Sequence, residues 1–202
     1  MLRDCFAPAH VKNPNYFGAL RPVVAEPLRF TESIRGRVHI TVDQSNIFRR
    51  GYVHGPRVDY ARVLDCLGGD ALVSATIVVS QPKLHRPSQL NFYAWLERLG
   101  WDVHSFALLQ NELGEISENE FLVDGDVRNE IRTAGLSSEI DAVVVMSGDG
   151  GMTNAVKDAR LAGKDVFVLA WADALNPALA AAATSYITLE EMLPLIGRPH
   201  FH

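Results

Sequence analysis

Short apolar runs alternate with amphipathic stretches from Arg37 onward, and this alternation limits the chain to one class of fold. Val38–Val42 is a run of mostly β-branched residues, which is typical of a strand. Ala142–Met146 is apolar at every position, as expected for a strand that is buried on both faces. Because helical patterns separate such strands over about 160 residues, the sequence predicts an α/β fold with a mostly parallel central sheet.

The same periodicities place the individual elements. Strands are expected at Val38–Val42, Leu72–Val79, Trp101–Ala107, Ala142–Met146, Asp165–Ala170 and Tyr186–Ile187. Helices are expected at Val58–Leu67, Ser88–Leu99, Val127–Ala134, Thr153–Ala162, Pro177–Ala183 and Leu189–Ile196. The acidic and polar stretch Asn111–Glu120 predicts a loop or a small hairpin.

Residues 1–34 differ from the rest of the chain. Four of the ten prolines lie there, and no periodic apolar pattern emerges. We expect an arm that is extended on the surface or partly disordered. Residues 35–202 are then expected to form a single domain, since one core is usual at this length.

The composition is that of a globular protein. Of the 202 residues, 48% are hydrophobic and 21% are charged, which excludes an intrinsically disordered chain. Apolar runs such as Ala142–Met146 and Ala178–Ala183 are far shorter than the ~20 residues that span a bilayer, so we expect no membrane partner. Cys5 and Cys66 are too few for a disulfide scaffold or a zinc site. The expected compartment is the reducing cytoplasm.

Charge is distributed unevenly along the chain. Residues 1–87 carry a net charge of +5 and residues 88–202 a net charge of −10, which gives the formal charge of −5. The basic part suits a polyanionic partner, and the acidic part supplies carboxylates. A surface that is merely solvated explains the same distribution, and this alternative stays open.

Acidic residues follow the two strands with the most buried patterns. Asp43 follows the first strand directly, and Asp149 lies in the glycine-rich segment Ser147–Gly151 after a later strand. Asp126 lies near the predicted start of a short helix. Because ligands of open parallel sheets bind beyond the carboxyl ends of the strands, we expect these three acids to converge on one cleft.

Three carboxylates in one cleft repel one another unless a cation lies among them. Mg²⁺ or Mn²⁺ suits such oxygen ligands, and a site of this kind hydrolyses phosphodiesters. The pair Asp124 and Asp126 at a helix start, taken alone, is explained more often as helix caps than as ligands. Ser147–Gly151 also resembles a phosphate-binding loop, but it lacks the Lys-Ser/Thr of a P-loop, so a nucleotide or phosphate binder is the weaker alternative.

Five short segments together resemble the motifs of NYN domains in the PIN-like nuclease superfamily. Val42–Ile47 is similar to the Asp-x-x-Asn motif that ends their first strand, and Arg57–Tyr60 to the start of their first helix. Gly125–Val127 is similar to their helix motif that carries an acid into the site. Val144–Gly151 and Leu175–Glu190 resemble their Ser-Gly-Asp motif and their closing segment. The order and spacing fit over residues 37–196.

The resemblance implies a three-layer α/β/α sandwich, PIN-like and Rossmann-like, with a ribonuclease site that depends on Mg²⁺ or Mn²⁺. Carried over by position, Asp43, Asp126 and Asp149 match the metal-binding, catalytic acids. Asn46 matches the polar residue beside the first acid, and Ser147 matches the hydroxyl residue before the third.

Two positions depart from the family pattern. Gly151 and Thr184 stand where such domains carry further acids. With fewer carboxylates, more of the six-oxygen shell of a cation must come from water or substrate phosphate. Asp124 and Asp173 are the candidates to substitute for the missing acids.

Basic residues near the first acid predict a path for RNA. We expect Arg49, Arg50 and Arg57 to contact substrate together with Asn46 and Ser147, because phosphate contacts position a strand without reading its sequence. The predicted function is a metal-dependent endoribonuclease that acts on single-stranded or structured RNA. The alternative is a module that keeps the fold, binds RNA or protein, and has lost the chemistry. A homo-oligomer stays open in both cases.

Overall fold

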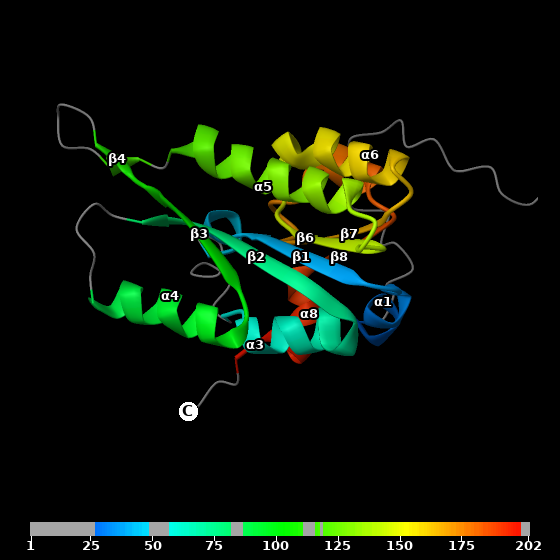
Figure 1. Ribbon diagram of the computed structural model, residues 1–202, viewed down its shortest axis with the longest axis horizontal. Helices are drawn as coiled ribbons and strands as arrows, with labels where there is room; N and C mark the ends of the chain where they lie inside the picture. Colours follow the sequence, from blue (N-terminus) through cyan, green and yellow to red (C-terminus); the bar gives the residue numbers. More distant parts are fainter. Residues whose placement is uncertain (1–26, 49–56, 82–86, 111–115, 118, 199–202) are drawn as a thin grey trace, which may run out of the picture.

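Six parallel strands form one sheet in the order β3-β2-β1-β6-β7-β8 (Figure 1). The structure, a computed structural model, describes residues 27–48, 57–81, 87–110, 116–117 and 119–198. The strands of the sheet are Val38–Asp43 (β1), Leu72–Gln81 (β2), Asp102–Ala107 (β3), Ala142–Met146 (β6), Asp165–Ala170 (β7) and Ser185–Thr188 (β8). A separate antiparallel hairpin pairs Leu109–Gln110 (β4) with Ile116–Ser117 (β5). The predicted parallel sheet is confirmed.

Helices cover both faces of the sheet. One face carries α5 (Glu120–Leu136), α6 (Thr153–Leu161) and α7 (Pro177–Ala182). The other face carries α1 (Pro27–Ser33), α3 (Tyr60–Val63), α4 (Pro87–Leu99) and α8 (Leu189–Ile196) (Figure 1). The three-layer α/β/α sandwich that the resemblance implies is thereby confirmed. No helix in the described part of the chain combines the length and the apolar character that crossing a bilayer requires.

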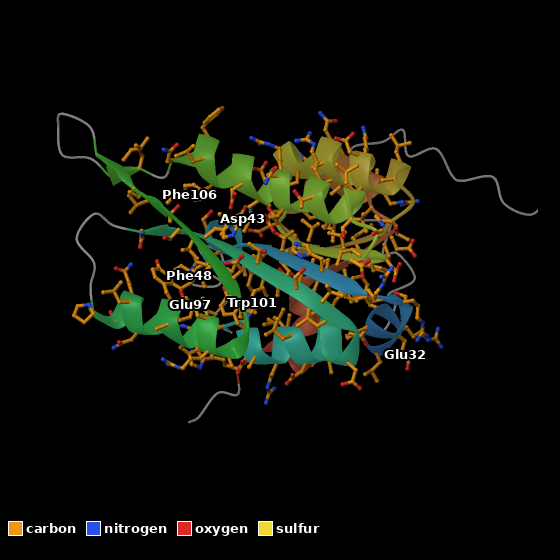
Figure 2. The ribbon with its side chains drawn as sticks, in the orientation of Figure 1. Glu32, Asp43, Phe48, Glu97, Trp101 and Phe106 are labelled. Atoms are coloured by element: carbon orange, nitrogen blue, oxygen red, sulfur yellow. The ribbon has the colours of Figure 1, made fainter. Side chains whose placement is uncertain are left out.

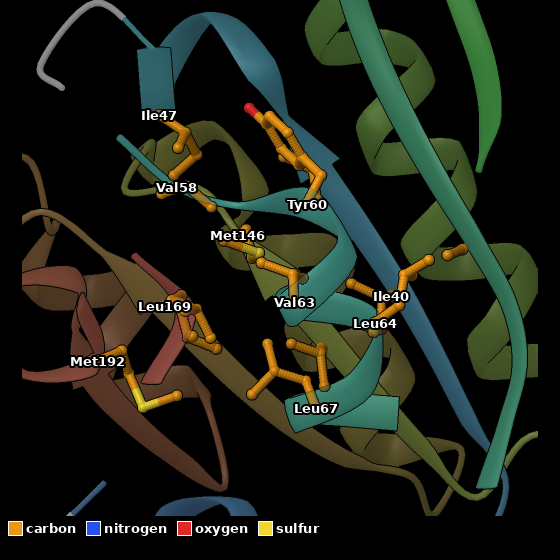
Figure 3. Packing of buried hydrophobic residues seen from close by; sticks show 14 of the residues in the cluster. Ile40, Ile47, Val58, Tyr60, Val63, Leu64, Leu67, Met146, Leu169 and Met192 are labelled. Carbon is orange, nitrogen blue, oxygen red and sulfur yellow. The ribbon is translucent and has the colours of Figure 1, made fainter. Parts of the chain in front are cut away.

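The core between the sheet and α3 brings together residues that lie far apart in the sequence. Ile40 and Met146 of the central strands pack there with Val63, Leu67 and Met192 (Figure 3). None of these side chains is more than 3% exposed. Burial of this kind stabilises the fold by roughly 1.5–3 kcal/mol for each large apolar side chain.

The direction in which the chain crosses the sheet reverses at its centre. From β1 the chain moves outward through β2 to β3, and its connecting helices α3 and α4 lie on one face. From β6 it moves the opposite way through β7 to β8, and α6 and α7 lie on the other face. Because both the direction and the face are reversed, all these crossovers have the same hand. β1 and β6 therefore frame the switch point, where ligands of such sheets bind.

Helix α5 is longer than the sequence predicts. It begins at Glu120 instead of Val127, because Asn119 caps it and its Oδ1 accepts a hydrogen bond of 3.4 Å from the backbone N–H of Leu122. Asp126, predicted to lie near the start of the helix, therefore lies inside it. The buried side chains of α5 against the sheet outweigh the weak helix propensity of its glycine and aspartate residues.

Two further elements differ from their predicted forms. The predicted helix Val58–Leu67 is observed as α3 followed by a π-helical turn, Leu64–Gly68. Within the predicted N-terminal arm, α1 is helical, and its Phe30 is fully buried with its ring edge-on to Phe167, 5.7 Å between centroids. The first 26 residues of that arm lie outside the described residues.

The side of α5 that faces the sheet is partly polar. Its Glu130 accepts a hydrogen bond of 2.8 Å from Oγ1 of Thr76, and Nδ1 of His39 lies 2.8 Å from Oγ of Ser74. Nε2 of His39 and Oγ1 of Thr41 are buried without a hydrogen-bond partner among the described residues. Oε2 of Glu130 lies 3.8 Å from that Nε2, too far for a hydrogen bond. The Glu130–Thr76 hydrogen bond gives α5 a directional attachment to the sheet.

His39 makes the folded state sensitive to acid. Burial lowers the pKa of His39 from 6.5 to about 4. Below pH 6.5 the unfolded chain therefore binds a proton that the folded chain excludes, and stability falls by up to about 1.4 kcal/mol per pH unit until pH 4. Urea unfolding between about pH 7 and 4.5 should show that the wild type loses about 2 kcal/mol more than His39→Asn does. The same pH dependence in both proteins would contradict this assignment.

Candidate acidic site at the switch point

Asp43 and Ser147 meet across the switch point. The register of β1 and β6 pairs Val42 with Met146, so the residues that follow them come side by side. Oγ of Ser147 donates a hydrogen bond of 3.0 Å to Oδ2 of Asp43. Asp43 is 3% exposed and Ser147 is fully buried. The strand register thus brings two of the predicted site residues into direct contact.

The buried carboxylate of Asp43 has further donors on its own side of the switch point. Its Oδ1 accepts hydrogen bonds from Oγ of Ser45 at 2.9 Å and from the backbone N–H of Asn46 at 3.1 Å. Residues 44–48 are helical, so Asp43 acts as the cap of this turn. Such donors offset the loss of hydration of a buried charge. Figure 2 shows Asp43 where the sheet lies beneath α5.

The segment after β6 is held from both sides. The backbone N–H of Gly148 donates to Oδ1 of Asn46 at 3.0 Å, and its carbonyl accepts from the backbone N–H of Asn176 at 2.9 Å. Nε1 of Trp171 donates to the carbonyl of Ile47 at 2.8 Å. The segments that follow β1, β6 and β7 therefore form one hydrogen-bonded rim at the carboxyl edge of the sheet.

Asp149 lies on this rim and is half-buried. Its backbone N–H donates to Oγ of Ser147 at 3.2 Å, so one hydroxyl contacts both Asp149 and Asp43. Its Oδ1 accepts a hydrogen bond of 2.9 Å from the backbone N–H of Gly151 and caps the 3₁₀ turn Gly150–Met152 (η4). Asp43, Ser147 and Asp149 thus form one continuous polar group.

Asp126, the third predicted acid, contacts a histidine of β3. Nδ1 of His104 lies 2.6 Å from Oδ2 of Asp126, and its Nε2 lies 3.2 Å from Oδ2 of Asp102. Burial alone lowers the pKa of His104, but the hydrogen bonds and charges of Asp126 and Asp102 outweigh it and raise the pKa above its ordinary value. An imidazolium donates from both nitrogens, which suits two carboxylate partners.

The oxygen atoms at this edge suit a hard cation that is coordinated by only a few protein ligands. Asp43 and Asp149 offer carboxylates, and Asn46 and Ser147 offer neutral oxygens, the chemistry that Mg²⁺ and Mn²⁺ prefer. Within the described ranges, no three His, Cys, Asp or Glu side chains are grouped so that they could hold a metal ion. Mg²⁺ is commonly bound by one or two carboxylates, with water and substrate phosphate completing the shell. The residues fit that kind of site through Asp43 and Asp149, while Asp126 is bound to His104.

The structure describes three of the five predicted substrate-binding residues: Asn46, Arg57 and Ser147. Asn46 and Ser147 lie on the rim, as stated above. Arg57 is exposed, and its carbonyl accepts a hydrogen bond of 2.8 Å from the backbone N–H of Arg198. This places the backbone of Arg57 beside the C-terminal segment. Arg49 and Arg50 lie outside the described residues.

Of the two departures from the family pattern, Thr184 lies away from the site. Its Oγ1 accepts a hydrogen bond of 2.8 Å from the backbone N–H of Val166 and donates to Oδ1 of Asp165 at 3.3 Å. Both partners begin β7, so Thr184 lies at the amino edge of the sheet, opposite the rim. Gly151, by contrast, is hydrogen-bonded to Asp149. Only the departure at Gly151 removes a side chain from the site.

Two residues that connect the site were missed by sequence reasoning. From the sequence, His104 has no expected role in the site, although its ring contacts Asp126. Asn176 was not singled out, although it fixes Gly148 and caps α7 through the backbone N–H of Ala178. The signal for His104 is the two-residue spacing of Asp102 and His104, which places both on one face of β3.

Comparisons with known proteins agree with this architecture. The family model for the NYN domain matches residues 37–190. A crystal structure of a protein of unknown function from Vibrio parahaemolyticus RIMD 2210633 superposes with a TM-score of 0.61. The two chains are 19% identical, and the match covers 78% of this chain and 94% of the other. At that identity the likeness concerns the fold alone. A search of curated proteins finds no match to the chain.

The glycines after β6 should differ sharply in their tolerance of a side chain. A methyl group on Gly148 would lie 2.5 Å from the carbonyl oxygen of Ala174, whereas one on Gly151 would meet nothing closer than 3.5 Å. Gly148→Ala should therefore destabilise the fold by about 1–3 kcal/mol, and Gly151→Ala should leave stability within about 0.5 kcal/mol. Chemical denaturation of the two variants measures both values. Equal stability of the two variants would mean that the rim is not packed as described.

The pKa of His104 should depend chiefly on Asp126. Asp126→Asn removes the charge at 2.6 Å and should lower the pKa of His104. Asp102→Asn should lower it less, because Asp102 is more exposed and its contact is 3.2 Å. Titration of the His104 ring by NMR measures both shifts. A larger effect of Asp102→Asn would reverse the assignment of the dominant partner.

Proposed function

The chain belongs to the NYN domain family of the PIN-like nuclease superfamily, and we propose that it is a metal-dependent endoribonuclease. The observation that carries this proposal is the contact of Asp43 with Ser147 across the switch point, together with the hydrogen bond that the backbone N–H of Asp149 donates to the same hydroxyl. The carboxyl edge of a parallel sheet is where ligands of such folds bind. The proposed reaction is hydrolysis of an RNA phosphodiester bond at this rim.

Asp43 and Asp149 are the proposed ligands of Mg²⁺ or Mn²⁺. When bound, such a cation lowers the pKa of a coordinated water and neutralises charge on the phosphoryl oxygens. Ser147 orients Asp43 through its 3.0 Å hydrogen bond, and Asn46 fixes the backbone that carries Asp149. Partners that orient ligands in this way typically affect metal affinity or activity by about 10- to 100-fold.

Asp126 is the third proposed acid, and its role depends on His104. In the structure its Oδ2 is bound to the histidine ring at 2.6 Å. A contribution of Asp126 to the metal site requires that this contact be opened or shared. Without that change, the carboxylate shell consists of the two acids on the rim.

A second candidate function is a binding module that keeps the fold without the chemistry. Three observations favour it: Asp43 is only 3% exposed, Asp126 is bound to His104, and position 151 carries no acid. Such a module would bind RNA through its phosphates without a requirement for a divalent cation. Metal dependence therefore separates the two candidates.

Cleavage of end-labelled single-stranded RNA in the presence of Mn²⁺ tests the proposal. We expect cutting that EDTA abolishes and that Asp149→Asn reduces by on the order of 100-fold or more, since loss of a direct ligand exceeds the loss of an outer-shell partner. Asp158→Asn is the matched control, because Asp158 undergoes the same chemical change on α6 while paired with Arg132.

Two outcomes would contradict the proposal. Cutting that persists in Asp149→Asn at the level of Asp158→Asn would remove the rim from the reaction. No cutting at all, together with a melting temperature that Mn²⁺ leaves unchanged, would instead support the binding module.

A further inference from the structure

A guanidinium with no assigned role lies at the acidic rim. Arg128 is on α5, and a methyl group built on Gly151 would lie 3.5 Å from its Nη1. One built on Gly125 would lie 3.9 Å from its Nη2. Side chains of a helix lean toward its N-terminus, and α5 begins at the carboxyl edge of the sheet. The charged end of Arg128 therefore lies between the start of α5 and the turn η4.

Arg128 is close to a carboxylate without being paired to it. The methyl carbon built on Gly151 would lie 3.5 Å from Nη1 of Arg128 and 3.5 Å from Oδ1 of Asp149. Among the described residues, no carboxylate oxygen comes within the 4.0 Å of an ion pair with Arg128. Arg132, one turn later on the same helix, donates from Nε to Asp158 at 3.0 Å. The donors of Arg128 are thus available to a ligand, while those of Arg132 are in use.

Gly151 leaves space beside these two charged groups. Its φ is not in the left-handed region, and an added methyl group would make only ordinary contacts. Neither the backbone nor the packing therefore demands glycine at this position. The missing side chain leaves room for a methyl group between the guanidinium of Arg128 on α5 and the carboxylate of Asp149, which caps η4.

We propose that Arg128 is a phosphate-binding residue that holds a nonbridging oxygen of the RNA backbone beside Asp149. The substrate class in this inference rests on the proposed function. A guanidinium presents N–H donors in a planar fork that matches phosphate oxygens. The acids would attract the cation that acts on this phosphate. Arg128 would bind the same phosphate from another side. The contact positions the strand without reading its bases.

The salt dependence of RNA binding tests this role. A fluorescein-labelled single-stranded RNA is bound between about 50 and 200 mM KCl in EDTA, so that no divalent cation enters the comparison. Arg128→Gln should lower the magnitude of the slope of log K against log salt by about 0.7, the loss of one phosphate contact on a single strand. Arg128→Lys should keep the slope near that of the wild type, because the positive charge remains. Arg132→Gln is the matched control and should leave the slope unchanged.

The outcomes separate this inference from the proposed function. A slope for Arg128→Gln equal to that of the wild type and of Arg132→Gln would overturn the phosphate contact. A wild type that binds RNA but never cuts it with Mn²⁺ would overturn the nuclease proposal, and the slopes would still decide the role of Arg128. A wild type that does not bind RNA would overturn both. A purely structural role would change the melting temperature of Arg128→Gln and leave its slope unchanged.

Discussion

The parallel pairing of β1 with β6 is the interaction on which the rest of the structure depends. It joins the two halves of the sheet, which are built outward in opposite directions and covered on opposite faces. Its register also fixes which residues emerge side by side at the carboxyl edge. A shift of one residue would turn Asp43 toward the apolar layer around Ile40 and would break its contact with Ser147. Fold and candidate chemistry therefore depend on one register.

The candidate site combines groups that are fixed to different degrees. Asp43 is buried and held by three donors, so its position is set before any ligand arrives. Asp149 is held through one oxygen and is half-buried. Asp126 is attached to the outer strand through His104. The carboxylate of Asp43 is therefore rigid, that of Asp149 is the more accessible to a ligand, and that of Asp126 is already bound to His104.

The sheet could be predicted from the sequence because its central strands β1, β6 and β7 are buried on both faces. The predicted bounds of Ala142–Met146 equal those of β6, and the positions of Asp43 and Ser147 follow from where the two strands end. The partner of Asp126 could not be predicted, because it depends on the rotation of α5 over a distant strand. The position of Thr184 could not be predicted either, because its distance from the site depends on which edge of the sheet it occupies.

The order of the strands also bears on how the protein behaves at high concentration. The outer strands of the described sheet are β3 and β8, and an outer strand can pair with the sheet of another molecule. β8 has only four residues, so it offers a short template for such pairing. β3 carries Asp102, whose side chain is 73% exposed, beside the ring of His104. A short strand at one edge and the exposed carboxylate of Asp102 at the other are features that disfavour pairing between the edges of two such sheets.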